Sequence, residues 1–206
     1  MYGPGSRGLF APNSDFMSFS LLVLGVASFL FHGSLRHTMQ FADEIGMLGL
    51  AWSMLQGTLT VRQSPARTRI ITTCLVIFFP LFAIFYVWSG KVIYHSTAFF
   101  IMLVALILRT HHLLHWLKPE FPEAKRLRWR VMGSKALVTL LAGYALWQID
   151  LEFCAPLRAL REWVGLPWAW LFELHGWWHI LTAMAASQFM DIFREMREEL
   201  ISEKDK

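Results

Sequence analysis

Long runs without charged side chains dominate this sequence and restrict how the chain can fold. Residues 16–35, 70–90 and 92–108 contain no Asp, Glu, Lys or Arg. An apolar run of about 17–25 residues is long enough to cross a bilayer as an α-helix. The chain is 55% hydrophobic and 17% charged, whereas soluble domains are about 45–50% apolar and about 25% charged. We therefore expect an all-α integral membrane protein.

Three less apolar stretches, residues 40–61, 131–149 and 168–193, complete a predicted set of six transmembrane helices. Residues 111–130 and 150–167 are expected to be polar loops. The predicted organisation is a short polar segment (residues 1–15), a transmembrane helical domain (residues 16–193) and a charged tail (residues 194–206). No internal repeat is evident, and this argues against a transporter built from repeated halves.

Lysine and arginine are distributed unevenly between the two sides of this predicted bundle. Fourteen of the 19 lie on the side of the chain ends, four lie on the other side, and Lys135 falls inside the fifth run. Cytoplasmic loops carry the excess of positive charge in membrane proteins. We therefore expect both termini to be cytoplasmic. Cys74 and Cys154 fall near opposite sides, so no disulfide is expected between them.

Polar residues gather at the non-cytoplasmic ends of three predicted spans. His175 and His179 lie four residues apart in the last span, a spacing that puts both on one helix face. His32 ends the first span, Asp43 begins the second, and Ser28 precedes His32 by one turn. Ionisable residues inside a membrane indicate a functional site by default.

Their chemistry suits metal-assisted hydrolysis of a carbonyl compound. Three neutral imidazoles with one open position are a ligand set of catalytic zinc, which makes hydroxide available near neutral pH. Asp43 is a candidate proton acceptor from water and donor to a leaving amine. Ser28 is a candidate donor to the developing oxyanion or to the attacking water. The membrane setting predicts a lipid substrate.

Each residue alone also has an ordinary structural interpretation. His32, or the pair His175 and His179, can serve as interhelical hydrogen-bonding groups. Asp43 can cap a helix N-terminus, and Ser28 can be a packing serine.

Other polar and aromatic residues are interpreted as interfacial. His111, His112 and His115 lie at a cytoplasmic helix end, while His37 and His95 are interfacial or alternative ligands. Trp178, between the paired histidines, is a candidate substrate-pocket residue. No phosphate-loop, dinucleotide or G-x-S-x-G motif is present, and no nucleic-acid partner is expected.

Three blocks of this sequence resemble the alkaline ceramidases, which belong to a wider group of seven-helix membrane hydrolases that includes adiponectin-receptor-like proteins. The first block is SFLFHGSL at residues 28–35, continued by MQFADEIGM at 39–47. The second is WQIDLEFCAPLR at 147–158, and the third is HGWWHILT at 175–182. The blocks follow the family's order and extend over most of the chain.

The resemblance implies hydrolysis of the ceramide amide to a sphingoid base and a free fatty acid. It implies Zn²⁺ held by His32, His175 and His179, with Asp43 acting on the water and Ser28 at the oxyanion. It also implies endoplasmic reticulum or Golgi membranes, with the site toward the lumen. The alternative is a catalytically impaired or receptor-like lipid-binding member.

One departure from the family concerns the N-terminus. The first predicted span corresponds to the family's second helix, so the six spans correspond to helices two to seven of a seven-helix bundle. The acidic, tryptophan-containing segment that supplies calcium ligands in the family has no match in residues 1–15, which hold one acidic residue, Asp15, and no tryptophan. No calcium site is therefore assigned. We expect either a shortened gene product or a divergent member with six helices.

Overall fold

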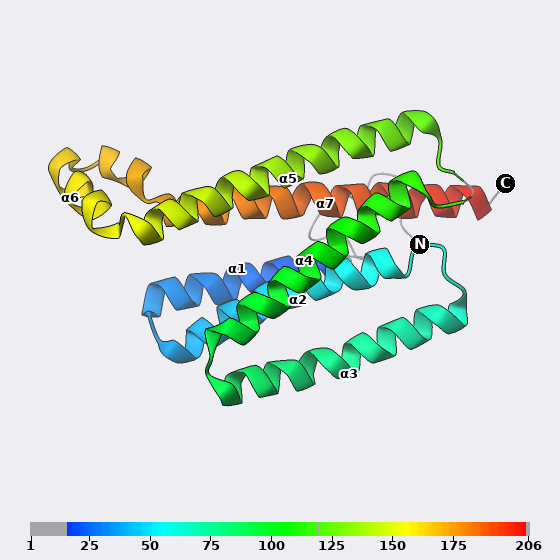
Figure 1. Cartoon of the computed structure of the whole chain (residues 1–206), viewed down its shortest axis with the longest axis horizontal. Coiled ribbons are helices and arrows are strands. Elements are labelled where there is room, and N and C mark those ends of the chain that lie inside the picture. Colours follow the sequence, from blue (N-terminus) through cyan, green and yellow to red (C-terminus); the bar gives the residue numbers. More distant parts are fainter. Residues whose placement is uncertain (1–15, 119, 205–206) are drawn as a thin grey trace. The chain divides into compact units, whose positions relative to one another are not determined.

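A computed structural model describes residues 16–118 and 120–204 of the chain (Figure 1). These residues form seven α-helices and one 3-10 helix, with no strand among them. The prediction of an all-α membrane protein is confirmed. Residues 1–15, which carry the predicted polar segment and Asp15, lie outside the described part. The elements are α1 (Phe16–Ser34), α2 (His37–Leu59), α3 (Pro65–Ser89), α4 (Val92–His115), α5 (Glu123–Glu152), α6 (Cys154–Val164), η1 (Trp168–Phe172) and α7 (Leu174–Lys204).

Each of the six predicted spans is mainly helical, but the helices differ in how apolar they are. Within the described residues, α1, α3 and α4 are long and apolar enough to cross a membrane by themselves. A fourth span results if α5 and α6, which are bent by 91° at their junction, count as one. The remaining two predicted spans correspond to α2 and α7, which carry more polar residues.

Several predicted boundaries are wrong because helices continue into polar sequence. α2 begins at His37 rather than at residue 40, and α4 and α5 take up most of the predicted loop at 111–130. The predicted loop at 150–167 contains α6. The start of α7 differs in the opposite direction: the helix begins at Leu174 rather than at residue 168, because the 3-10 turn η1 (Trp168–Phe172) comes first. Polar and basic side chains tolerate helical backbone well, so a loss of apolar character did not mark these helix ends.

The limits of α3 follow from local sequence. Ser64 caps its first turn by accepting a hydrogen bond from the Arg67 amide at 3.3 Å, and Pro65 occupies the first turn. Proline fits there because its missing N–H would have no helical partner. At the other end Gly90 adopts φ +62°, the left-handed conformation that glycine reaches without steric cost.

The described chain divides into two compact units. The first unit contains α1 to α4 and the end of α7 from Arg197, and the second contains residues 120–196. In the first unit α2 is central, since it contacts α1, α3 and α4. This position explains why α2 can be less apolar than its neighbours, because many of its side chains face other helices rather than lipid. α2 has eight buried residues, whereas α3 has one, Tyr86.

Close packing of α1 on α2 depends on a glycine. A Cβ atom on Gly46 would lie 3.2 Å from the Leu24 backbone, so only glycine allows this approach without displacement. On the α3 side of α2, Trp52 stacks on Phe79 with ring centroids 4.7 Å apart. Small residues that let backbones approach are typical of helix pairs in membranes.

The second unit is built on an antiparallel pair, α5 and α7, which run side by side in Figure 1. Trp129 near the start of α5 donates a hydrogen bond of 2.8 Å to Glu195. Near the other end Trp147 stacks on Trp178, with centroids 5.5 Å apart. Between them Gly143 lies against α7, where an added Cβ would be 3.1 Å from Leu181 Cβ. The start of α7 is therefore held closely against α5.

Candidate metal centre

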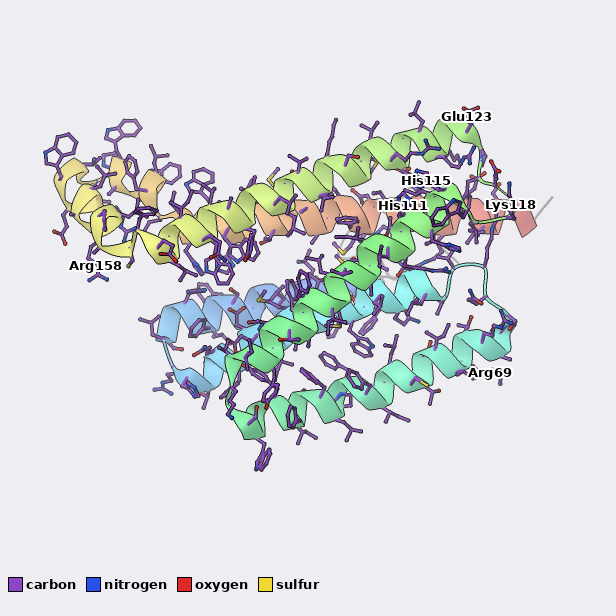
Figure 2. All side chains as sticks on the ribbon, in the orientation of Figure 1. Arg69, His111, His115, Lys118, Glu123 and Arg158 are labelled. Carbon is purple, nitrogen blue, oxygen red and sulfur yellow. The ribbon has the colours of Figure 1, made fainter. Side chains whose placement is uncertain are left out.

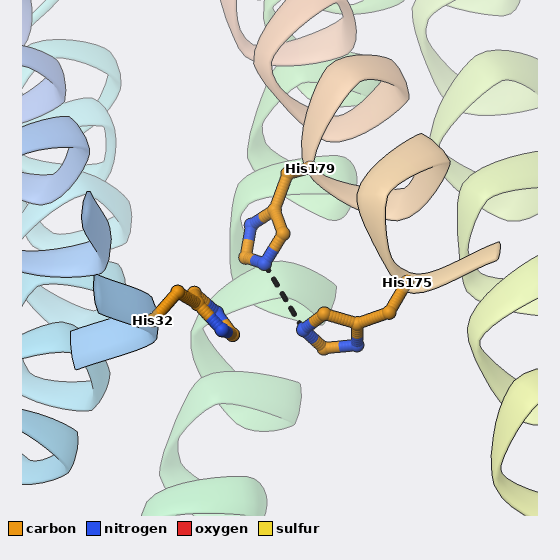
Figure 3. Close-up of side chains that lie close together, drawn as sticks. All are labelled: His32, His175 and His179. Atoms are coloured by element: carbon orange, nitrogen blue, oxygen red, sulfur yellow. Dashed lines mark hydrogen bonds between the residues drawn. The ribbon is translucent and has the colours of Figure 1, made fainter. Parts of the chain in front are cut away.

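The two paired histidines meet at the beginning of α7. His175 is the second residue of the helix and His179 follows one turn later. Their Nε2 atoms are 3.0 Å apart and the rings are nearly perpendicular, at 80° (Figure 3). Both side chains are half-buried. The i, i+4 spacing therefore brings two ring nitrogens to one point, as the sequence predicts.

This geometry fits a shared metal ion. Two nitrogens bound to one tetrahedral zinc at about 2.0–2.1 Å are roughly 3.3 Å apart. The observed 3.0 Å separation needs only a small opening to reach that value. Each histidine offers one ring nitrogen as a ligand. The pair thus supplies two ligands of the kind and spacing that zinc takes.

Neighbouring side chains hold this turn of α7 in place. Trp178, next to His179, is buried, and its ring packs against Tyr144 and Trp147 of α5. The Thr182 hydroxyl donates one hydrogen bond that is shared between the carbonyls of Trp178, at 2.7 Å, and His179, at 3.2 Å. Because Trp178 is taken up by packing against α5, its role in a substrate pocket stays a prediction.

The other three predicted site residues belong to the α1–α2 hairpin of the first unit. Ser28 and His32 lie one turn apart on α1, Ser28 half-buried and His32 exposed. Asp43, on α2, is buried, with 8% of its surface exposed. Leu24 lies against Gly46, so in this antiparallel hairpin Ser28, one turn beyond Leu24, comes level with Asp43. A hydroxyl and a buried carboxylate thus share one end of the hairpin.

The alternative interpretation of Asp43 as a helix N-cap is wrong. α2 begins six residues earlier, at His37, and its N-cap residue is Arg36. Asp43 is therefore inside the helix, where its side chain cannot satisfy the free amides of the first turn. Capping therefore does not explain this buried carboxylate, and a chemical role for Asp43 stays a prediction.

Sequence reasoning missed a polar network around the neighbouring residue, Glu44. The carboxylate accepts hydrogen bonds from the Tyr86 hydroxyl and from Gln40 Nε2, the latter at 3.1 Å. His95 Nε2 donates to the Glu44 carbonyl oxygen at 3.1 Å. Tyr86 and His95 are 1% and 6% exposed, so both side chains lie inside the first unit rather than on its surface. Their polar groups within apolar runs were the available signal.

We expect Tyr86→Phe to lower the free energy of unfolding by about 1 kcal/mol, as for other hydrogen bonds between membrane helices. The substitution removes one donor to the half-buried Glu44 carboxylate and leaves the ring packing intact. Unfolding in mixed micelles measures the change. Tyr94→Phe is the control, because Tyr94 is 38% exposed. Equal losses in the two variants would contradict the role of this hydrogen bond.

A second i, i+4 histidine pair, His111 and His115 at the end of α4, differs from the first (Figure 2). Both residues are exposed, and the rings stack with centroids 4.1 Å apart. His115 Nδ1 bonds to the His111 carbonyl at 2.9 Å. Here one ring nitrogen is engaged by the helix backbone, which is consistent with the predicted helix-end role.

These features define a helical membrane protein with a histidine pair suited to a metal ion at the end of one helix. The chain belongs to the Ceramidase family, which it matches over residues 9–206. It is 28% identical to alkaline ceramidase 3 of Mus musculus over 171 residues, which cover 81% of this chain and 60% of that protein. It is 29% identical to alkaline ceramidase YPC1 of Saccharomyces cerevisiae over 184 residues, 82% of this chain and 57% of that protein. The chain thus spans somewhat over half the length of these relatives.

Proposed function

We propose that this chain hydrolyses the amide bond of ceramide, releasing a sphingoid base and a free fatty acid, in a zinc-dependent reaction. The observation that carries the proposal is the pair of Nε2 atoms 3.0 Å apart on His175 and His179. Membership of the Ceramidase family and similarity to two alkaline ceramidases support the substrate. His32 is proposed as the third ligand from the first unit. When bound, zinc supplies water with a pKa near 7 and so makes hydroxide available.

The chain's own residues then transfer the proton and stabilise the negative charge that develops on the carbonyl oxygen. Asp43 accepts the proton that the attacking water loses and passes it to the amide nitrogen as the C–N bond breaks, so that the amine leaves neutral. The Ser28 hydroxyl donates a hydrogen bond to the carbonyl oxygen while negative charge develops there. Their common level at one end of the α1–α2 hairpin supports these paired roles.

The orientation and location are also proposed. The excess of Lys and Arg on the side of the C-terminal tail supports a cytoplasmic tail and a site toward the lumen. The endoplasmic reticulum or Golgi is the proposed membrane by likeness to the family. Calcium ligands are not assigned, so hydrolysis is to be compared with and without added calcium.

Metal removal tests the proposed reaction directly. The purified chain in lipid vesicles is expected to contain about one zinc and to release fatty acid from ceramide. Chelation should abolish release because the hydroxide source is lost. Added Zn²⁺ should restore it, and Mg²⁺ should not. Mass spectrometry of the products and elemental analysis of the protein provide the two readouts.

Two outcomes would contradict the proposal. Undiminished hydrolysis after complete metal removal would exclude the zinc-dependent reaction. Bound zinc without turnover of any ceramide, with or without calcium, would indicate the receptor-like lipid-binding alternative.

A further inference from the structure

The connection between α5 and α7 turns sharply out of the direction of the long helices. α6 leaves α5 at an angle of 91°. If α5 crosses the membrane, α6 then runs close to the membrane plane. Its 11 residues extend only about 16 Å at the helical rise, too short to span a hydrocarbon core of about 30 Å.

The outward surface of α6 is divided between apolar and charged side chains. Leu157, Leu160 and Val164 are half-buried, on the side where α6 packs on η1. Trp163 is 83% exposed, on the same outer face as Ala159. The charged edge of α6 carries Arg158, whose side chain projects from the helix in Figure 2, and Glu162. An apolar face beside a charged edge is typical of helices that lie in the membrane interface.

The segment after α6 adds more exposed apolar surface of the same kind. Leu166 is 88% exposed, the highest value among the large apolar residues described. Trp168 and Trp170 of η1 are 62% and 51% exposed. Tryptophan concentrates at membrane interfaces because its ring is apolar and its N–H is polar.

This segment is attached to the helix that carries the histidine pair. The Arg161 guanidinium donates to the Phe172 carbonyl at 3.1 Å and pairs with Glu173 at 3.3 Å. Trp177 Nε1 donates to the Leu171 carbonyl at 3.0 Å, and its ring lies 5.5 Å from that of Trp170. A shift of the segment would therefore move the start of α7.

We propose that residues 154–172, the α6–η1 segment, dock on the bilayer at the boundary between lipid headgroups and acyl chains. The three charged residues of α6 (Arg158, Arg161 and Glu162) oppose a re-entrant position deep in the hydrocarbon. The exposed Trp163, Leu166 and Trp168 oppose a position in bulk water, because large apolar side chains gathered in one exposed segment indicate a contact site. The headgroup region of a bilayer accommodates both the charged edge of α6 and the exposed apolar side chains beside it.

Docking fixes the depth of the histidine pair. His175 follows η1 by three residues, and His179 lies one helical turn further, about 6 Å along the axis. Both then lie just below the headgroups, at the level of the polar linkage between headgroup and acyl chains. This consequence, unlike the docking itself, rests on the proposed function: a lipid amide at that depth reaches the pair without leaving the bilayer.

Depth measurements on the full chain test the docking without an activity readout. In a Cys74→Ser, Cys154→Ser background, single cysteines replace Trp163, Leu166 and Trp168 and receive spin labels in lipid vesicles. Arg158→Cys and Glu162→Cys are matched controls on the charged edge of α6. Phe78→Cys, on the exposed face of the spanning helix α3, gives the hydrocarbon reference. Collision with oxygen and with an aqueous nickel chelate gives each depth.

We expect the three apolar positions to lie at headgroup depth, oxygen-accessible and shielded from nickel, and the two charged positions to be open to nickel. Equal nickel access at positions 163 and 158 would overturn the docking. A depth at 163 equal to that at Phe78 would show a re-entrant segment instead. Shielding that disappears at a low protein-to-lipid ratio would assign the surface to a second copy of the chain.

The catalytic consequence has its own test. The double variant Trp163→Ser, Leu166→Ser should show a several-fold higher KM for ceramide in vesicles, because interfacial binding scales with buried apolar area. Its hydrolysis of a short-chain ceramide that is dissolved as single molecules, outside vesicles and micelles, should be unchanged. Trp116→Ser, at the end of α4, is the control. An unchanged KM in vesicles would overturn the depth argument, whereas a parent chain without any hydrolysis would refute the proposed function and leave the spin-label result standing.

Discussion

Replacing His179 with alanine is expected to abolish zinc binding and to lower ceramide hydrolysis by more than about 100-fold. Even the outer partners of metal ligands account for about 10–100-fold in metal affinity or activity, so loss of a ligand should cost more. The Nε2 atom of His179 lies 3.0 Å from that of His175, so one nitrogen alone would remain on α7. Zinc content and fatty-acid release should fall together.

The second histidine pair provides a matched control. His115→Ala removes one member of an i, i+4 pair on α4 in the same way, but from an exposed site where a ring nitrogen bonds to the backbone. Zinc content and hydrolysis are expected to stay at the parent level. Comparable losses in His115→Ala and His179→Ala would show that the change in activity reflects damage to the fold.

Combining variants tests whether the first unit supplies the third ligand. His32→Ala alone should reproduce the loss seen in His179→Ala. The double variant should then show no further loss, because residues that act as one centre are strongly non-additive. Losses that multiply would place His32 and His179 in separate functions and would remove His32 from the proposed site.

The general architecture could be predicted because it depends on local composition. The uncharged runs that became α1, α3 and α4 need no partner to be recognised, since the lipid alone requires an internally bonded backbone. α6 could not be found in this way. It has only 11 residues and three charges. Its apolar face can be interpreted only when the 91° bend and the packing on η1 are known. The charges that suggested a loop mark the edge of an amphipathic helix.

For the candidate site, prediction succeeded where spacing within one helix decides the geometry. His175 and His179 meet because they are four residues apart on α7. The Glu44 network joins residues that are far apart in the sequence: Tyr86 follows Glu44 by 42 positions and His95 follows it by 51. Such contacts depend on how the three helices α2, α3 and α4 pack together. Asp43 lies between these two cases. Its residue type indicated a chemical role, but only the structure, in which α2 begins at His37, excluded the capping role.

Asp43→Asn is expected to lower hydrolysis by about 10²–10⁴-fold, the usual contribution of general acid–base catalysis, while zinc content stays at the parent level. The amide has nearly the shape of the carboxylate but cannot accept the proton from water or return it to the amine. Because Asp43 is buried in the interior of α2, the exchange should perturb neither a helix end nor the surface. Single-turnover release of fatty acid from labelled ceramide measures the chemical step.

Asp191→Asn is the control for this change, because it removes the same charge from a half-exposed pair with Arg194 on α7. It should hydrolyse ceramide at the parent rate. If Asp43→Asn keeps full activity, the proton is carried by another group and the proposed role of Asp43 is wrong. If it loses zinc in step with activity, Asp43 positions the metal ligands instead. Only retained zinc with a slowed chemical step supports Asp43 as the group that carries the proton from water to the leaving amine.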